Sequence, residues 1–331
     1  MTIRKLIAVA IAILIPILLP LVVRNPYYLH LLILIGINSV LSMTFILMLR
    51  TGLISIGIAG FWGIGAYASA LLTIKLGMPV WLAMPASTAI TAVIAAILGA
   101  LVVKKGGLSF VIQTLAFGFI IVLVFGTFDI FGGHVGIVNI SHPEPVPVPF
   151  LGTVTFTSIS KTPFYYLMLS LVLLMVLVLS AFYSAWAGRA WRAIGLSAHL
   201  AESLGINLFN YRLMAFILGS AIEGLMGSFY AHYYGALVPG SFGPFKTIYI
   251  HAYAILGGIG FPILGPVIGS FIMTFVPEFL RFTEGVEPIF TGLLIIIIIL
   301  FMPNGLLGLS HYWRRKKGFT RAKYHPSTGP S

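Results

Sequence analysis

The chain contains no cysteine and very little charge. Of its 331 residues only 8% are Asp, Glu, Lys or Arg, whereas a soluble globular chain carries about 25%. The absence of cysteine excludes disulfide bonds, iron–sulfur clusters, thiolate zinc sites and cysteine nucleophiles. Hydrophobic residues make up 59% of the sequence, and the mean hydropathy is +1.07. We therefore expect most of the chain to be surrounded by lipid and not by water.

The motifs of common enzyme and cofactor sites are also missing. The sequence has no phosphate-binding Gly-x-x-x-x-Gly-Lys-Ser/Thr motif, no His-Glu-x-x-His and no Gly-x-Ser-x-Gly, and its 7 acidic residues do not cluster. Gly63 and Gly65 resemble the start of a dinucleotide-binding motif, but they lie in an apolar segment without the strand that such a motif requires. We predict that the chain is not an enzyme and that it binds neither a metal ion nor a cofactor.

Long apolar segments predict an all-α polytopic integral membrane protein. A helix crosses the bilayer core with roughly 20 apolar residues. Windows of this kind lie at 6–23, 28–49, 53–74, 79–103, 108–131, 163–186, 212–234, 248–263, 265–280 and 287–302. The eighth and ninth are short and interrupted by glycine and proline, so they are either half-helices or a re-entrant pair. The sequence thus predicts about 8–10 transmembrane helices, some of them Gly/Pro-broken.

The distribution of charge predicts the orientation. Lys and Arg number 19 against 7 acidic residues, which gives a net charge of +12. If the N- and C-termini are cytoplasmic, most of the basic residues fall on the inside, as is usual for membrane proteins. The excess charge then marks the cytoplasmic side and includes a basic tail at 303–331, so we expect no nucleic-acid partner. We predict a multi-pass protein of the cell (cytoplasmic) membrane, with a transmembrane permease domain at 1–302.

Two hydrophilic segments are longer than a simple turn. The external segment, 132–162, has proline at alternate positions from Pro143 to Pro149, which excludes a helix and favours extended backbone. It also contains Asn139 in a glycosylation sequon, which matters only in a host that glycosylates. The cytoplasmic segment, 188–211, is predicted to form two short helices with breaks at Gly195 and Gly205.

A single carboxylate lies in the middle of an apolar span. A charged side chain at that depth is expensive and marks a functional hypothesis by default. Glu223 shares a helical stripe with Gly219 and Gly227, four residues away on each side, so we expect it to face a closely packed helix. Three interpretations remain open, namely a hydrogen-bonded structural group, a group that lines a substrate path, and the proton or cation site of an ion-coupled transporter.

An ordered series of motifs resembles the permease subunits of branched-chain amino acid ABC transporters, in particular the longer LivM-type subunit. The series runs through GLISIGIAGFWGIGAY at 52–67, TLAFG at 114–118, GRAWRAI at 188–194 with ESLGIN at 202–207, YAH at 230–232, LGGIG at 256–260 with GPVIG at 265–269, and LFMPNGLLG at 300–308. Together the motifs cover most of the chain. Gly/Pro-interrupted spans such as 248–263 are typical of transporters that bind substrate near the membrane midplane.

The resemblance implies the permease subunit of an ATP-driven importer for branched-chain or other apolar amino acids. Its partners would be a second homologous permease subunit, two cytoplasmic ATP-binding subunits and an external substrate-binding protein, and only the partner subunits would use ATP. Docking on the ATP-binding subunit would involve Arg189, Arg192, Glu202, Gly205 and Asn207. The substrate path would be lined by Gly57, Gly60, Gly63, Gly65, Tyr67, Thr114, Phe117, Gly118, Glu223, Tyr230, Gly257 and Gly258.

Two other functions stay open at this point. The first is an importer of the same type that carries urea or a short amide. The second is an ion-coupled secondary transporter that uses Glu223.

Overall fold

The computed structural model describes residues 14–23, 25–104, 106–148, 152–157, 159–280, 292–293, 296 and 305–308. Of the first predicted span, 6–23, residues 14–22 are described and are helical. The predicted span at 287–302 and the basic tail at 303–331 lie almost wholly outside the described residues.

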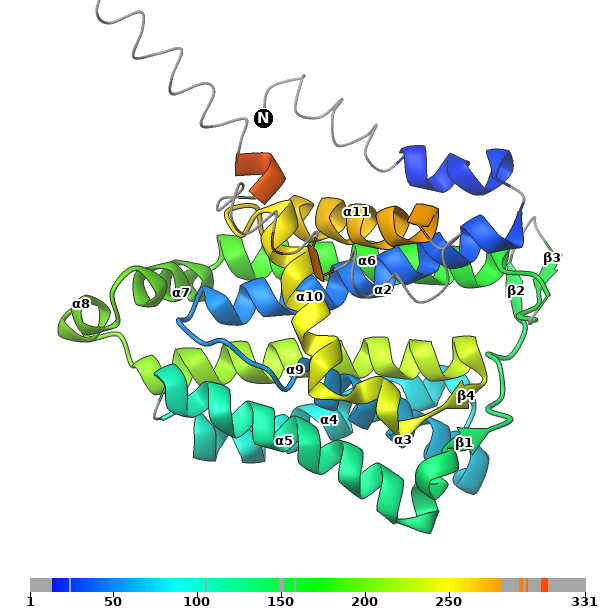
Figure 1. The fold of residues 1–331 in the computed structure, drawn as a ribbon, viewed down its shortest axis with the longest axis horizontal. Helices are drawn as coiled ribbons and strands as arrows, with labels where there is room; N and C mark the ends of the chain where they lie inside the picture. The colour runs from blue at the N-terminus through cyan, green and yellow to red at the C-terminus, as the bar shows by residue number, and fades with distance from the viewer. Residues whose placement is uncertain are drawn as a thin grey trace, which may run out of the picture.

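Long apolar helices make up the body of the protein (Figure 1). They are α2 (Pro26–Leu49), α3 (Ile58–Leu76), α4 (Val80–Val102), α5 (Gly107–Thr127), α6 (Thr162–Ser184) and α9 (Leu208–Tyr234). These six helices, of 19 to 27 residues, are the ones in the described part of the chain that are long and apolar enough to cross a membrane. The prediction of an all-α polytopic membrane protein is confirmed.

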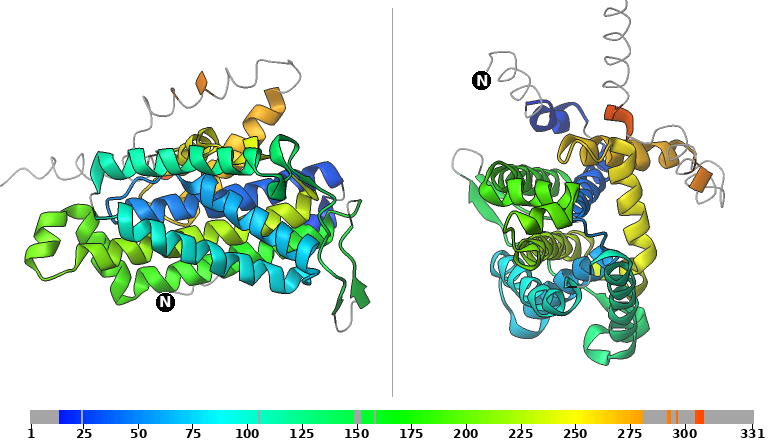
Figure 2. Two further views of the ribbon diagram at one scale, coloured as in Figure 1. Left: turned by 90° about the horizontal axis from the view of Figure 1, so that it is seen from below. Right: turned by 90° about the vertical axis from the view of Figure 1, so that its left-hand side faces the viewer.

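The bundle is organised around α9, which packs against α3 and α4 on one side and against α2 on the other. Seen along the bundle, α9 lies between α6 and α4 (Figure 2, right). The contact between α3 and α9 is so close that a Cβ atom added at Gly65 would overlap the backbone of Gly224, and one added at Gly227 would overlap the carbonyl of Trp62. Such small-residue contacts are the usual way in which helices associate in lipid, where the hydrophobic effect does not drive them together.

Two shorter helices follow the bundle and account for the eighth and ninth predicted spans. α10 (Pro244–Gly257) has 14 residues and α11 (Leu264–Leu280) has 17. At 1.5 Å per residue α10 is about 21 Å long, short of the roughly 30 Å hydrocarbon core. α10 crosses the long helices at a steep angle, and α11 runs back alongside α2 (Figure 1). The two helices therefore form a returning pair, which was one of the two predicted arrangements.

The helix boundaries differ from the predicted spans at glycine-rich connections. The predicted span 248–263 ends early, because Gly258 has φ 115° and the chain turns before α11 begins. The span predicted to start at 53 begins instead at Ile58, after the non-helical segment 51–57. The span predicted to reach 131 ends at Thr127 and is followed by the 3-10 turns η1 (Asp129–Phe131) and η2 (Gly133–Val135).

Short strands gather at one end of the bundle, which we call the sheet end. β1 (Ile137–Val138) pairs antiparallel with β4 (Ala236–Leu237), and β2 (Val146–Val148) pairs with β3 (Gly152–Val154). The 3-10 turn η3 (Pro239–Phe242) follows β4 and leads into α10. The proline-rich segment is thus extended, as its sequence predicts.

Polar contacts hold the proline-rich segment on the sheet end. Both carboxylate oxygens of Glu144 accept hydrogen bonds from the backbone N–H of Val80, at 2.9 and 3.1 Å, at the start of α4. The Nδ1 atom of His232 donates to the carbonyl oxygen of Ser141 at 2.7 Å, and its Nε2 atom lies 2.8 Å from the hydroxyl of Ser69. These contacts join the segment to α3, α4 and α9.

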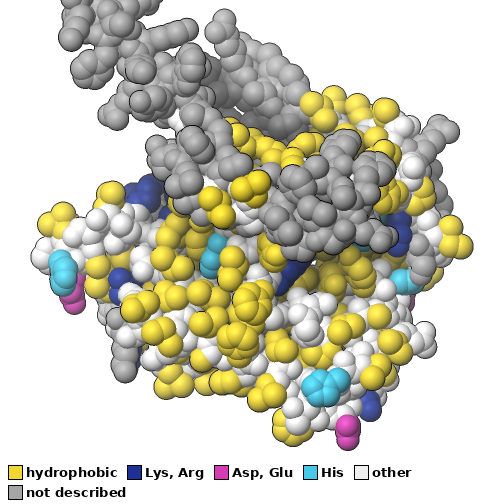
Figure 3. Space-filling model, viewed as in Figure 1, with side chains coloured by type: hydrophobic (Ala, Val, Ile, Leu, Met, Phe, Trp, Pro, Cys, Tyr) yellow, Lys and Arg dark blue, Asp and Glu magenta, His cyan; other side chains and the backbone are white. Residues whose placement is uncertain are grey.

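The opposite end, which we call the α7–α8 end, is helical. α7 (Trp186–Leu196) and α8 (Ala198–Ser203) form the two short helices that the sequence predicts, although the first break lies at Ser197 and not at Gly195. The second break includes Gly205, which has φ 81°. Hydrophobic atoms cover much of the side of the bundle, and charged atoms gather towards its two ends, with basic atoms also visible in a central hollow (Figure 3).

Candidate functional site

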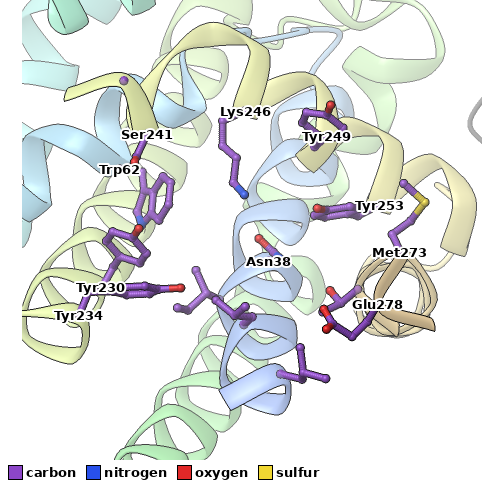
Figure 4. A pocket seen from close by; sticks show the side chains of 15 residues that line it. Asn38, Trp62, Tyr230, Tyr234, Ser241, Lys246, Tyr249, Tyr253, Met273 and Glu278 are labelled. Carbon is purple, nitrogen blue, oxygen red and sulfur yellow. The ribbon is translucent and has the colours of Figure 1, made fainter. Parts of the chain in front are cut away.

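A cavity of about 580 Å³ lies where α2, α3, α9, α10 and α11 meet (Figure 4). Its walls carry both polar and apolar side chains from all five helices and from η3. The lining residues are Leu31, Leu34, Ile37, Asn38, Trp62, Tyr230, Tyr234, Gly240, Ser241, Lys246, Tyr249, Tyr253, Met273, Thr274 and Glu278. A mixed cavity of this size between helices of a bundle is the usual setting for a small-molecule site.

The polar groups of the cavity come from different helices and converge on the same space. Lys246 of α10 extends its ammonium group into the cavity, Asn38 of α2 presents its amide, and Glu278 of α11 lies on the opposite wall (Figure 4). Ionisable side chains at membrane depth are rare, and they usually face a bundle interior or a water-filled cavity where they serve transport. The cavity thus offers a cationic group, an acidic group and an amide to one small solute.

Aromatic rings form another wall of the cavity. Trp62 and Tyr230 meet edge to face with ring centroids 4.7 Å apart, and Tyr230 and Tyr234 are 4.4 Å apart. The Nε1 atom of Trp62 and the Oγ1 atom of Thr274 are buried and have no hydrogen-bond partner among the described residues. Buried polar atoms are normally satisfied, so both atoms are placed to bind a solute or water.

Regular helical spacing explains why these side chains meet. Lys246, Tyr249 and Tyr253 are separated by three and four residues on α10, so they share one face of that helix. Tyr230 and Tyr234 are four apart on α9 in the same way. We did not predict the cavity, although a lysine followed by two tyrosines at helical intervals was a signal of it in the sequence.

Most of the residues predicted to line a substrate path do not line this cavity. Tyr230 is the one that lines it. Gly57 and Gly60 pack against Phe117, Gly63 packs against Phe242, and Gly65 packs against α9. Gly118 lies against Pro244, and the ring of Tyr67 stacks on Phe125 with centroids 4.0 Å apart. The assignment of these residues to a path stays a prediction.

The segment before α3 has a backbone that needs partners, because a non-helical chain inside a membrane protein must satisfy its polar groups internally. Thr114, a predicted path residue on α5, accepts the backbone N–H of Ile56 at 3.1 Å. Thr247 of α10 accepts the N–H of Ala59 at 3.0 Å, and His251 donates from Nε2 to the carbonyl oxygen of Ser55 at 2.9 Å. The break before α3 is therefore held by α5 and α10.

Gly257 and Gly258, also predicted path residues, lie at the turn between α10 and α11. A Cβ atom at Gly257 would overlap the carbonyl oxygen of Gly265, and one at Gly269 would overlap the carbonyl oxygen of Tyr253. The glycines thus permit the close return of α11 along α10, which in turn places Glu278 opposite Lys246 across the cavity.

Glu223 is fully buried where α9 meets α2. Its Oε1 atom lies 2.7 Å from the Thr44 hydroxyl, which is also 2.8 Å from the carbonyl oxygen of Leu41. Gly219 faces α2 and Gly227 faces α3, so the predicted close packing on both sides of Glu223 is present. Glu223 does not line the cavity.

A second hollow, of about 450 Å³, lies at the α7–α8 end. Three of the predicted docking residues, Glu202, Gly205 and Asn207, line it together with Lys104 and Arg212. Glu202 is near enough to Arg212 to interact with it electrostatically. Arg189 and Arg192 lie on α7 and do not line this hollow.

Exposed leucines lie beside this hollow, and sequence reasoning missed them. Leu196 is 88% exposed, Leu200 64% and Leu204 74%. Exposed apolar patches are typical of surfaces that bind another protein or a membrane. Their four-residue spacing in an otherwise polar segment was the available signal. Among the residues that the structure describes, no cluster of His, Asp or Glu could hold a metal ion.

Comparison with known proteins identifies the family. Residues 27–303 match the family model described as the permease component of the branched-chain amino acid transport system. The chain belongs to this family, and it is a multi-pass membrane transport protein and not an enzyme.

Individual relatives agree with this assignment. The chain is 28% identical over 292 residues to the high-affinity branched-chain amino acid transport system permease protein LivM of Escherichia coli and of Salmonella typhimurium, which covers 83% of this chain and 67% of each relative. Over 194 residues it is 25% identical to the guanosine ABC transporter permease protein NupQ of Bacillus subtilis, covering 55% of this chain and 59% of that one. No solved structure matches the chain.

Proposed function

We propose that this chain is the transmembrane permease subunit of an ATP-driven ABC importer for branched-chain or other apolar amino acids. Its partners are a second homologous permease subunit, two cytoplasmic ATP-binding subunits and an external substrate-binding protein. The chain itself binds no cofactor, because ATP is bound and hydrolysed by the partner subunits.

The observation that carries this proposal is the construction of the α7–α8 end. Leu196, Leu200 and Leu204 are exposed there beside a hollow lined by Glu202 and Asn207, and an apolar patch of this kind with charged neighbours suits a protein partner. A partner that docks on α7 and α8 can move α9, because the indole Nε1 of Trp191 on α7 donates to the carbonyl oxygen of Tyr211 at 2.9 Å. We assign this end to the cytoplasm and to the ATP-binding subunit.

The cavity supports transport of a small amphipathic solute. Its apolar wall from α2, its aromatic wall from α3 and α9, and its charged groups on α10 and α11 suit a zwitterion that has an apolar side chain. The names of the relatives cover different cargo, namely branched-chain amino acids and guanosine. The chemistry of the cavity is therefore the better guide to the cargo of this chain.

The test is uptake into proteoliposomes that contain the whole importer. We expect leucine, isoleucine or valine to accumulate when ATP, both ATP-binding subunits and the substrate-binding protein are supplied, and uptake to stop when any of them is omitted. Uptake driven by a proton gradient without the ATP-binding subunits would refute the proposal and favour the ion-coupled alternative. ATP-dependent uptake of urea or acetamide in place of leucine would support an ATP-driven importer but would contradict amino acids as its substrate.

A further inference from the structure

Two walls of the cavity carry hydrogen-bond donors, one of them cationic. Lys246 contributes a cationic ammonium group with three donors, and it is directed into the cavity from α10 (Figure 4). The indole N–H of Trp62, on the neighbouring wall, has no acceptor in the described part of the chain. A solute group that satisfies both residues must accept several hydrogen bonds, and a carboxylate, with two oxygens and about four lone-pair sites, is such a group.

The opposite side of the cavity suits the remainder of an amino acid. Glu278 provides a carboxyl group for the ammonium group of such a solute. Leu31, Leu34 and Ile37 offer an aliphatic wall on α2. The positive and negative groups lie on facing helices, α10 and α11, so a zwitterion can bind between them (Figure 4).

We propose that Lys246 binds the carboxylate of the solute inside the permease, so that the membrane subunit itself selects solutes that carry a carboxylate and discriminates against urea, short amides and other neutral compounds. The proposal rests on the proposed function for its setting, and it adds a selection step that acts after the substrate-binding protein has released its cargo. Hydrogen bonds between charged partners are stronger than those between neutral ones, and this difference supplies the selectivity.

The test measures binding to the purified permease, assembled with its membrane and ATP-binding partners in detergent, without the substrate-binding protein. Radiolabelled leucine is the probe, and leucinamide, which lacks the carboxylate, is the competitor. We expect leucinamide to compete at least about tenfold more weakly than unlabelled leucine, which is the loss typical of a hydrogen bond to a charged group. Equal competition by the two compounds would overturn the proposal.

Variants of Lys246 locate the effect. Lys246→Met should weaken leucine binding by about tenfold or more, and Lys246→Arg, which keeps the positive charge, should retain most of it. Lys75→Met is the matched control, because Lys75 is exposed at the end of α3 and does not line the cavity. If Lys246→Met does not assemble, Lys246→Gln replaces it, since glutamine keeps a polar end. Wild-type affinity in the neutral variant that assembles would overturn the proposal.

The binding test separates this proposal from the proposed function. A complex that binds leucine through Lys246 but fails to import it with ATP would overturn the proposed function alone. A complex that imports leucine with ATP and keeps full leucine binding and uptake in Lys246→Met would overturn the role of Lys246 alone.

Discussion

Substitution of Gly65 by alanine tests one of the close helix contacts in the described part of the chain. In the structure, the Cβ atom of an alanine at this position would lie 2.5 Å from the carbonyl carbon of Gly224 and would overlap the carbonyl oxygen. Since non-bonded heavy atoms normally stay at least about 3.5 Å apart, α3 and α9 would have to separate by roughly 1 Å or more. The obstacle is backbone, so it cannot rotate away as a side chain would.

The expected magnitude follows from two opposing effects. Overpacking of a well-filled contact costs about 1–3 kcal/mol, and the cost should lie at the upper end because α9 contacts α2, α3 and α4 at the same time. Replacing a helical glycine by alanine returns about 1 kcal/mol of helix propensity. We therefore expect a net destabilisation of about 2 kcal/mol, which for a chain of this length lowers the melting temperature by about 3 °C.

The assay is thermal unfolding in detergent followed by tryptophan fluorescence, to which Trp62 on the same helix contributes. Gly260→Ala is the matched control, because a Cβ atom there meets nothing within 4 Å, and it should melt like the wild type. A melting temperature of Gly65→Ala at or above that of the wild type would refute the packing argument, and would favour the predicted place of Gly65 on an open path.

Three further variants test the two ends of the bundle and its buried carboxylate. Leu200→Asp should weaken binding of the ATP-binding subunit at least about tenfold in a pull-down, because burial of a leucine contributes about 1.5–3 kcal/mol. Ile159→Asp, at a position that is also exposed, should not weaken it. Unchanged capture by Leu200→Asp would exclude docking there. Glu223→Gln should leave the stability and leucine uptake near wild type, because glutamine can keep the hydrogen bond to Thr44 and position 223 lies outside the cavity. Loss of uptake in a folded variant would show that Glu223 takes part in transport. Ser69→Ala should lower the free energy of unfolding by about 1–3 kcal/mol, because the buried Nε2 atom of His232 loses its hydrogen-bond partner. Wild-type stability of this variant would contradict a stabilising hydrogen bond between Ser69 and His232.

The transmembrane helices could be predicted from the sequence because their signal is local. α2, α4 and α6 begin and end within about two residues of the predicted spans, since each is an apolar run bounded by proline, glycine or charge. The predicted boundaries were wrong where a glycine changes the backbone direction inside an apolar run, as at Gly258, because hydropathy does not register a change of φ. For the same reason, the predicted span that includes α5 was extended past Thr127 into η1.

The cavity could not be predicted because it depends on how distant helices meet. The position of Lys246 could not be predicted, since the sequence does not say that α10 crosses the bundle and directs this side chain inwards. A glycine such as Gly65 is compatible both with a tightly packed helix contact and with the wall of a substrate path. Only the structural element that faces the glycine distinguishes the two. The structure places Gly224 opposite Gly65, and it places the aromatic side chain of Tyr230 in the cavity.

Single-cysteine labelling tests the central claim most directly, namely that the α7–α8 end faces the cytoplasm and binds the ATP-binding subunit while the sheet end faces outwards. The chain has no native cysteine, so Leu200→Cys in α8 and Ile159→Cys in the connection between β3 and α6 each introduce a unique thiol at an exposed position. In intact cells, a membrane-impermeant maleimide should label Cys at 159 and not at 200, and added ATP-binding subunits should protect position 200 in inverted vesicles. Labelling of position 200 from outside the cell would contradict the account.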